Sequence, residues 1–218
     1  MSGPLAEQLR AMGAPADKIA VLRNGVDLAR FRPMDRDEAR RHLRIDGNLL
    51  LTVGNLVELK GHQLAVQAMV ELRDARLLII GEGPMASELR KLADRLQVGD
   101  RVTICGNMAQ EQLVTYYNAA DALVLASSQE GMPNVILESI ACGTPVIATG
   151  VGGVLEVIRD PAAGIVLRER SPAAIVEAFR QLLARPQDRI RTRAWAEQFG
   201  WADTVSGLLD VFRGARAH

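Results

Sequence analysis

Short apolar segments of strand length alternate with amphipathic helical segments through most of this 218-residue chain. Parallel strands need a crossover connection, usually a helix, so this alternation predicts right-handed βαβ units. It therefore predicts an α/β fold, a Rossmann-like parallel sheet flanked by helices on both faces. The strand candidates lie between turn residues and are Leu49–Val53, Leu77–Ile80, Arg101–Cys105, Asp121–Ala126, Val146–Ala148 and Gly164–Leu167.

The two ends of the chain add further elements to this pattern. Near the start we expect a short helix over residues 5–12 and an additional strand over 19–22. Ser171 and Pro172 predict the N-cap and first turn of a helix, and two more helices follow at about residues 188–199 and 203–213. A chain of this length suits one domain, so residues 1–218 are predicted to form a single unit.

Composition excludes several classes of function. Lys and Arg together number 26, as do Asp and Glu, so no net positive charge is present to attract nucleic acid. No apolar run approaches the roughly 20 residues of a membrane span, and the N-terminus does not resemble a signal peptide. Cys105 and Cys142 lie in apolar contexts, which favours two reduced thiols in a cytoplasmic protein.

The stretch from Ser127 to Glu138 follows a strand candidate and leads into a helix that can accommodate Pro133 in its first turn. Unpaired backbone N–H groups gather at the start of such a helix and, with its dipole, favour an anion. Glu130 and Glu138 place a carboxylate on each side of this group. Backbone donors suit phosphate and carboxylates suit sugar hydroxyls; the alternative is an ordinary helix start preceded by a loop glutamate.

Other glycine-containing loops fall at the carboxyl ends of predicted strands, the edge at which such sheets bind ligands. They are residues 54–61, 81–84, 106–108 and 150–153. Lys60 is one of only three lysines, and a cation there could neutralise a diphosphate leaving group or be a solvated surface charge. His42 and His62 have no paired partner in the sequence and are not predicted to be catalytic.

Residues Gly81 to Ala86 match the G-x-G-x-x-A dinucleotide pattern and keep a nicotinamide-dependent enzyme as an alternative. The match follows a late strand, however, and Pro84 stiffens the turn. The next strand also ends at Gly106 and Asn107, without the acidic residue that would bind a ribose.

Together these residues resemble the C-terminal, nucleotide-sugar-binding half of the GT-B glycosyltransferases of the retaining family 4. Gly54 and Asn55 with Lys60-Gly61 are similar to that family's first phosphate loop. Glu130 and Glu138, separated by seven residues, are similar to its E-x7-E motif. Other segments also follow the family's sequence pattern, so the resemblance covers nearly the whole chain. These segments are Asn24–Asp27, Gly143–Val146, the Gly152-Gly153 pair with Glu156, and Gly164.

The resemblance implies hexosyl transfer from a UDP-, GDP- or ADP-sugar in glycan biosynthesis, with no metal and no other cofactor. Lys60 and Glu130 would be catalytic, Lys60 countering the charge of the departing diphosphate and Glu130 lying beside the sugar. Glu138 would accept hydrogen bonds from the ribose, and Asn107 and Met108 would contact the base. The other implied substrate-binding residues are Gly54, Asn55, Glu82, Gly131, Met132, Pro133, Asn134 and Val135.

Two departures from the family pattern shape the expectation. The family usually has Arg directly after the first-loop glycine, and here Asn55 cannot supply that second positive charge. The chain also begins about where an N-terminal acceptor-binding domain would end, and helices at about 188–214 would cross back to it. We therefore expect a donor-binding fragment that is inactive alone, with any peripheral contact to the inner face of a membrane made by the other half; the alternative is a nucleotide-binding module without chemistry.

Overall fold

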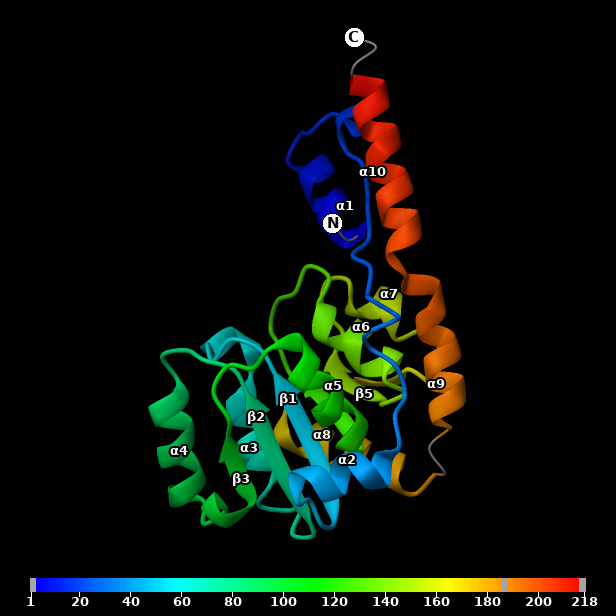
Figure 1. The fold of residues 1–218 in the computed structure, drawn as a ribbon. Coiled ribbons are helices and arrows are strands. Elements are labelled where there is room, and N and C mark those ends of the chain that lie inside the picture. Colours follow the sequence, from blue (N-terminus) through cyan, green and yellow to red (C-terminus); the bar gives the residue numbers. More distant parts are fainter. Residues whose placement is uncertain (1–2, 186–187, 216–218) are drawn as a thin grey trace.

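The computed structural model describes residues 3–185 and 188–215 and forms one six-stranded parallel sheet with helices on both faces (Figure 1). The strands are β1 Asn48–Val53, β2 Ala75–Ile80, β3 Val102–Ile104, β4 Ala122–Leu125, β5 Val146–Thr149 and β6 Gly164–Leu167. The helices are α1 Gly3–Ala11, α2 Arg36–Leu43, α3 His62–Ala68, α4 Ala86–Arg95, α5 Gln110–Ala119, α6 Asn134–Ala141, α7 Val154–Val157, α8 Pro172–Leu183, α9 Arg189–Ala196 and α10 Trp201–Ala215. The fold predicted from the alternation of segments is confirmed.

The strand order is β3-β2-β1-β4-β5-β6, so the direction of winding reverses between β1 and β4. After β1 the chain adds β2 and β3 on one side, then returns to place β4 on the other. The register pairs Leu50 with Ala122 and Leu51 with Leu123. Ligands of such sheets bind beyond the carboxyl ends of the strands at this switch point. The loops after β1 and β4 are therefore the first place to look for a site.

The central strands β1, β4 and β5 bury both faces, which explains their continuous apolar sequences. In β1, Leu49 and Leu51 belong to a core that contains residues of α5 and α6. The intervening Leu50 joins a core with residues of α3, α4 and α8. Side chains alternate between the faces of a strand, so this one segment contributes to both cores. Two helical layers thereby hold the sheet rigid beneath its loops.

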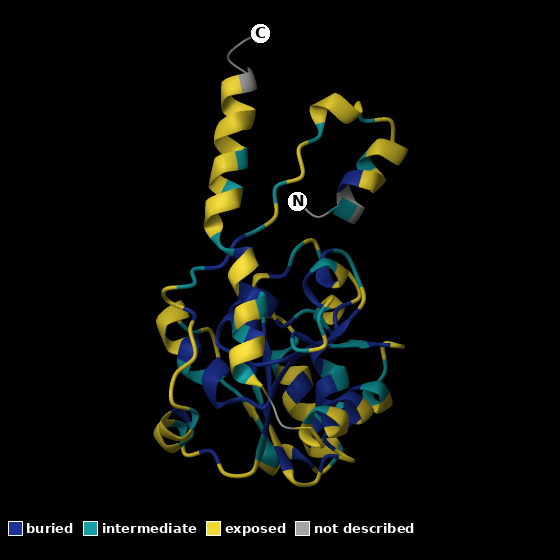
Figure 2. Ribbon diagram, turned by 90° about the vertical axis from the view of Figure 1, so that its right-hand side faces the viewer, coloured by how far each residue is buried: buried dark blue, intermediate teal, exposed yellow. Residues whose placement is uncertain are grey.

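Both ends of the chain lie outside the sheet. Helix α10 extends beyond it (Figure 1), and most of the surface of α10 is exposed (Figure 2). Helix α1 contacts α7, where the Gly3 N–H donates to Oε1 of Glu156 at 2.8 Å. No helix of the described residues is long and apolar enough to cross a bilayer. The large side chains exposed on α10 are Trp201, Val205, Leu208, Leu209, Val211 and Phe212.

Two local expectations are wrong. Residues 19–22 form no strand, because this segment packs against α10: the carbonyl of Arg23 accepts a hydrogen bond from the Thr204 hydroxyl at 2.7 Å. Helix α6 begins at Asn134, and Pro133 stands one position earlier in an extended conformation with φ −75° and ψ 113°. The predicted N-cap at Ser171 is confirmed, since its side chain accepts a hydrogen bond from the Ala174 N–H at 3.2 Å.

Candidate functional site

The loops after β1 and β4 meet directly at the switch point. The N–H of Ser128 donates a hydrogen bond to the carbonyl of Leu59 at 2.8 Å. Gly61 has φ 72°, and a Cβ there would lie 2.1 Å from the carbonyl oxygen of Ala126. Only glycine tolerates both that conformation and that approach. This close packing brings the end of one loop, with Lys60, against the loop that carries Glu130.

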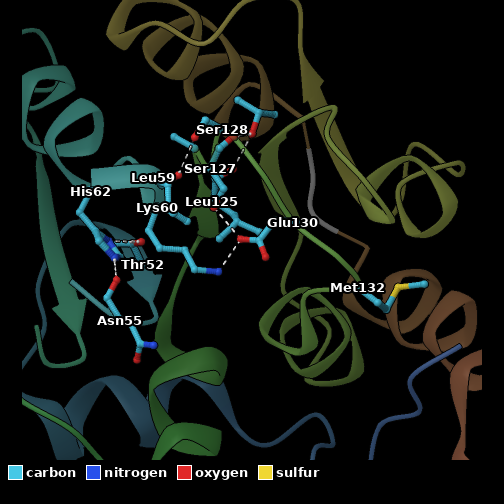
Figure 3. Close-up of polar contacts among 12 residues, drawn as sticks. Thr52, Asn55, Leu59, Lys60, His62, Leu125, Ser127, Ser128, Glu130 and Met132 are labelled. Atoms are coloured by element: carbon cyan, nitrogen blue, oxygen red, sulfur yellow. Dashed lines mark hydrogen bonds and ion pairs between the residues drawn. The ribbon is translucent and has the colours of Figure 1, made fainter. Parts of the chain in front are cut away.

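Lys60 and Glu130 form an ion pair (Figure 3), with 2.6 Å between Nζ and Oε1. The Ser127 hydroxyl donates to the same Oε1 atom, also at 2.6 Å. The Lys60 side chain is 22% exposed and that of Glu130 only 7%. Among the described residues nothing donates a hydrogen bond to Oε2 of Glu130, so one carboxylate oxygen is fixed and the other is available to a ligand.

The backbone between Glu130 and α6 supplies hydrogen-bond donors. Within the described part of the chain, the N–H groups of Gly131, Met132, Asn134 and Val135 donate to no protein acceptor. They stand at or just before the N-terminus of α6, where the helix dipole favours negative charge. The arrangement matches the anion-binding helix start expected from the sequence.

A second glycine loop holds this backbone from behind. The N–H of Gly153 donates to the carbonyl of Gly131 at 2.7 Å. Gly152 has φ 53°, and a Cβ there would lie 1.8 Å from the carbonyl oxygen of Glu130. The loop after β5 therefore fixes where Glu130 and Gly131 lie, and a side chain at position 152 would displace them.

Glu138 lies one turn into α6 and is held by a buried tyrosine. The Tyr117 hydroxyl donates to Oε2 of Glu138 at 2.7 Å. Burial raises the pKa of the Glu138 carboxyl, against the opposing effects of the Tyr117 hydrogen bond and the charge of Arg30. Burial, followed by the charge of Glu138, raises the pKa of Tyr117 well above its ordinary value. Tyr117 therefore stays protonated and donates to Glu138. This hydrogen bond fixes the orientation of the Glu138 carboxylate and leaves Oε1 to accept other hydrogen bonds.

The loop after β1 is held as tightly as the loop after β4. Gly54 donates its N–H to Ile80 at 2.9 Å, and the carbonyl of Asn55 accepts from the Val57 N–H at 2.9 Å. The same carbonyl lies 3.1 Å from Nε2 of His62, whose Nδ1 lies 3.0 Å from the Thr52 hydroxyl. Asn55 itself is exposed, and its side chain adds no charge at this position.

The remaining predicted residues lie on neighbouring loops of the same sheet edge, and within the described chain they form no hydrogen bond with Lys60 or Glu130. Glu82 exposes its side chain and uses its carbonyl to accept from the Leu56 N–H at 2.7 Å. Asn107 is exposed, and its Oδ1 accepts from the N–H of Met108 at 3.1 Å. The side chain of Met108 packs against the core.

The dinucleotide-like pattern at residues 81–86 has no open loop for a pyrophosphate. A Cβ on Gly83 would lie 2.5 Å from the carbonyl oxygen of Leu56, and the Met85 N–H donates to that same carbonyl at 3.0 Å. The glycines therefore serve close packing of the loops after β1 and β2. This geometry argues against the nicotinamide alternative.

Sequence reasoning missed four residues that shape the site: Ser127, Tyr117, His62 and Asn24. The Asn24 amide donates to the carbonyl of Met132 at 3.2 Å and to Oδ1 of Asn134 at 2.9 Å. Ser127 adjoins the predicted motif and could have been named from its position. The contacts of Tyr117 and His62 depend on tertiary packing and carry no sequence signal. Within the described residues, no group of three or more His, Cys, Asp or Glu side chains could hold a metal ion.

Known proteins share this sequence and this fold. The D-inositol 3-phosphate glycosyltransferase of Acidothermus cellulolyticus is 39% identical over 224 residues, which cover 94% of this chain and 50% of that protein. The chain spans about half the length of the curated relatives it matches. Sucrose-phosphate synthase from Thermosynechococcus elongatus has a TM-score of 0.87 at 27% identity, covering 100% of this chain and 58% of that one.

The Anabaena protein HepE, solved in complex with UDP and glucose, has a TM-score of 0.87 at 19% identity and shares the fold; the match covers 100% of this chain and 62% of that one. Residues 35–199 match the family described as glycosyl transferases group 1, a span that contains Lys60, Glu130 and Glu138. With its α/β fold of GT-B type, the chain belongs to this family of glycosyltransferases.

Proposed function

We propose that this chain binds the nucleotide-sugar donor in a glycosyltransferase that transfers a hexosyl group with retention of configuration. The observation that carries the proposal is the pairing of Lys60 with Glu130 at the switch point, beside unpaired N–H groups and the second carboxylate, Glu138. The sheet edge thus presents donors for a diphosphate and acceptors for two sets of hydroxyls. Family membership supports this assignment.

In the proposed reaction, the bond between the sugar and the diphosphate breaks while the oxygen of an acceptor hydroxyl attacks the same face of the sugar, and the proton of that hydroxyl passes to the departing diphosphate oxygen. Lys60 and the backbone N–H groups of Gly131, Met132, Asn134 and Val135 would stabilise the charge that develops on the leaving diphosphate. Oε2 of Glu130 would accept a hydrogen bond from a sugar hydroxyl, and Glu138 would accept from the ribose. These fixed charges and dipoles would replace a metal ion, so we propose transfer without one.

A further part of the proposal concerns the other half of the enzyme. Exposed apolar residues 201, 205, 208, 209 and 212 recur on one side of α10 with helical spacing. We propose that this side packs against an acceptor-binding domain. The relatives support this, because the chain matches only about half of their length. That domain would provide acceptor specificity and any membrane contact, and the two free cysteines suit a cytoplasmic enzyme.

Calorimetry with UDP, GDP, ADP and their sugars tests the donor assignment. We expect the 218-residue chain to bind one of these nucleotides weakly, and Glu138→Ala to weaken that binding. Unchanged affinity in this variant would rule out a ribose contact at Glu138. Efficient sugar transfer by these 218 residues alone would contradict the proposed need for a second domain.

A nucleotide-binding module without chemistry is the second candidate, because Asn55 provides no charge where the family usually has Arg. The two candidates differ in one measurement. Introducing Asn55→Arg should raise turnover of the two-domain enzyme if the site is catalytic. Nucleotide binding with no turnover in either form would favour the module.

A further inference from the structure

His62 is buried at the start of α3 and lies across the loop that carries Lys60. Its side chain is among the least exposed in the chain, with a relative exposure of 1% for the residue. Figure 3 shows the ring between Thr52 and the backbone of Asn55, with Lys60 beside it. The imidazole therefore connects the start of α3 to strand β1, through Thr52, and to the beginning of the loop after β1, through Asn55.

The two partners of His62 fix which nitrogen carries its proton. A carbonyl oxygen can only accept, so the contact of 3.1 Å to Asn55 requires a proton on Nε2. In a neutral ring Nδ1 then accepts, and the Thr52 hydroxyl donates to it across 3.0 Å. Burial, with a smaller effect from the charge of Lys60, lowers the pKa of His62 and favours this neutral ring.

The hydrogen bond to Asn55 completes the immobilisation of one peptide group. The Asn55 carbonyl accepts from His62 and from the Val57 N–H, while the Leu56 N–H at the other end of that peptide group donates to Glu82. Between Gly54 and Val57, the N–H groups of residues 54, 56 and 57 all donate within the described chain, and that of Asn55 does not. Within the described residues, the Asn55 N–H is therefore an unpaired backbone donor on the same loop as Lys60.

We propose that His62 is a positioning residue for the donor diphosphate: its Nε2–H fixes the Asn55 carbonyl and so holds the Asn55 N–H and Lys60 toward the phosphates. This assignment rests on the proposed function. The assignment adds to the proposed function a residue that holds the loop after β1 in place. His62 acts through the backbone of Asn55, whose side chain carries no charge.

Two substitutions separate the contacts of the ring. In His62→Gln the side-chain amide reaches the position of Nε2 and can still donate to Asn55. In His62→Asn the shorter amide can contact Thr52 but loses Asn55. We expect His62→Gln to bind a nucleoside diphosphate within about twofold of wild type and His62→Asn to bind it about five- to tenfold more weakly, the effect of one hydrogen bond. The corresponding nucleoside monophosphate, which lacks the second phosphate, should bind all three proteins alike.

The control for a purely structural role is the unfolding midpoint of each variant in urea. If His62→Asn is destabilised yet binds the diphosphate as well as wild type, His62 is only a core residue and the proposal fails. Equal loss of diphosphate affinity in both variants would also overturn it. Failure of the wild type to bind any nucleoside diphosphate would instead overturn the proposed function, and this assignment with it.

A second measurement does not depend on a substitution that has to fold. The ¹⁵N chemical shifts of the imidazole in the wild-type chain report its tautomer. We expect a neutral ring protonated on Nε2 at neutral pH, in contact with Thr52. A ring protonated on Nδ1 could not donate to Asn55 and would contradict the proposal.

Discussion

Two buried carboxylates lie at opposite edges of the sheet and are used differently. Asp121 precedes β4 at the amino edge, and Glu130 follows β4 at the carboxyl edge; their side chains are 8% and 7% exposed. Asp121 engages both oxygens: Oδ1 pairs with Arg36, and Oδ2 accepts from the Leu49 N–H at 2.7 Å and lies 3.5 Å from Arg40. Among the described residues, Glu130 engages only its Oε1 atom. The two carboxylates are therefore buried to the same extent but differ in their partners: Asp121 has a structural role, and Glu130 keeps one oxygen free to accept a hydrogen bond.

The two ends of α6 repeat this contrast. At its C-terminal end, Arg189 donates to the carbonyl of Cys142 at 2.8 Å and Arg193 donates to that of Ala141 at 3.0 Å. At its N-terminal end, the N–H groups described above donate to no residue in the described chain. At the C-terminal end of α6, the fold provides hydrogen-bond partners for the backbone carbonyls. Within the described residues, it leaves donors unpaired on the side where we propose that the ligand binds.

The largest expected effect tests the structural side of this comparison. Asp121→Asn removes the charge that faces Arg36 and Arg40 in a mostly buried setting, and we expect it to lower the free energy of unfolding by about 3 kcal/mol. Urea denaturation measures the change. The matched control is Glu71→Gln, whose ion pair with Arg180 is exposed and should contribute less than about 1 kcal/mol. Equal effects in the two variants would remove the distinction between buried and exposed pairs.

The next largest effect concerns the ligand side. Lys60→Met removes the one lysine at the switch point, and we expect nucleoside diphosphate affinity to fall about ten- to one-hundredfold, because hydrogen bonds to charged groups contribute roughly 1.5–3 kcal/mol. Lys91→Met, on the exposed surface of α4, is the control and should bind as wild type does. Retained affinity in the Lys60 variant, measured by calorimetry, would place the diphosphate elsewhere.

A smaller effect distinguishes the two carboxylates directly. Glu130→Gln releases Lys60 from its ion pair, so we expect a nucleoside diphosphate without sugar to bind up to about fivefold more tightly, because the phosphate no longer competes with a carboxylate for one hydrogen bond from Nζ. Stability should change far less than in Asp121→Asn. A drop in stability as large as that of the Asp121 variant, seen in urea, would make Glu130 a structural residue too.

The smallest expected effect is the pH dependence contributed by His62. Its folded pKa is lowered from 6.5, so the unfolded chain binds more protons between that lowered value and 6.5. Stability should therefore rise with pH through this window and be lost as the pH falls through it. Urea titrations from pH 7 to 5 should show a shallower dependence on pH in His62→Gln than in the wild type, and an equally steep dependence in this variant would contradict the assignment to His62.

The fold could be predicted from the sequence because each strand of a doubly covered parallel sheet is a short apolar run between turn residues. Glu130, Glu138 and Lys60 could be identified from their loops, since the carboxyl ends of all parallel strands share one edge. The order of the strands could not be predicted from the sequence. The contact between Lys60 and Glu130 therefore could not be predicted either, because it depends on β4 pairing with β1. That order arises from packing of both faces at once, which no local pattern encodes.

The supporting contacts were also outside the reach of local patterns. Tyr117 and Glu138 come from different helices, and their hydrogen bond forms only when α5 and α6 pack together. His62 binds a hydroxyl and a main-chain carbonyl, neither of which marks a histidine as functional in a sequence. The strand expected over residues 19–22 did not form because this segment pairs with no strand of the sheet; the next residue, Arg23, instead accepts a hydrogen bond from Thr204 of α10, nearly 180 residues further along.

The ion pair between Lys60 and Glu130 has a kinetic consequence. Before a donor arrives, the two charges at the switch point cancel, and the chain as a whole carries no net charge. An approaching nucleotide sugar would therefore meet little long-range attraction, and its capture would depend on short-range contacts once it has reached the loops after β1 and β4. If the donor binds here as proposed, the positive charge of Lys60 would become available only to a ligand close enough to compete with a carboxylate for it, and the resting site would favour a correctly placed diphosphate over anions in bulk solution.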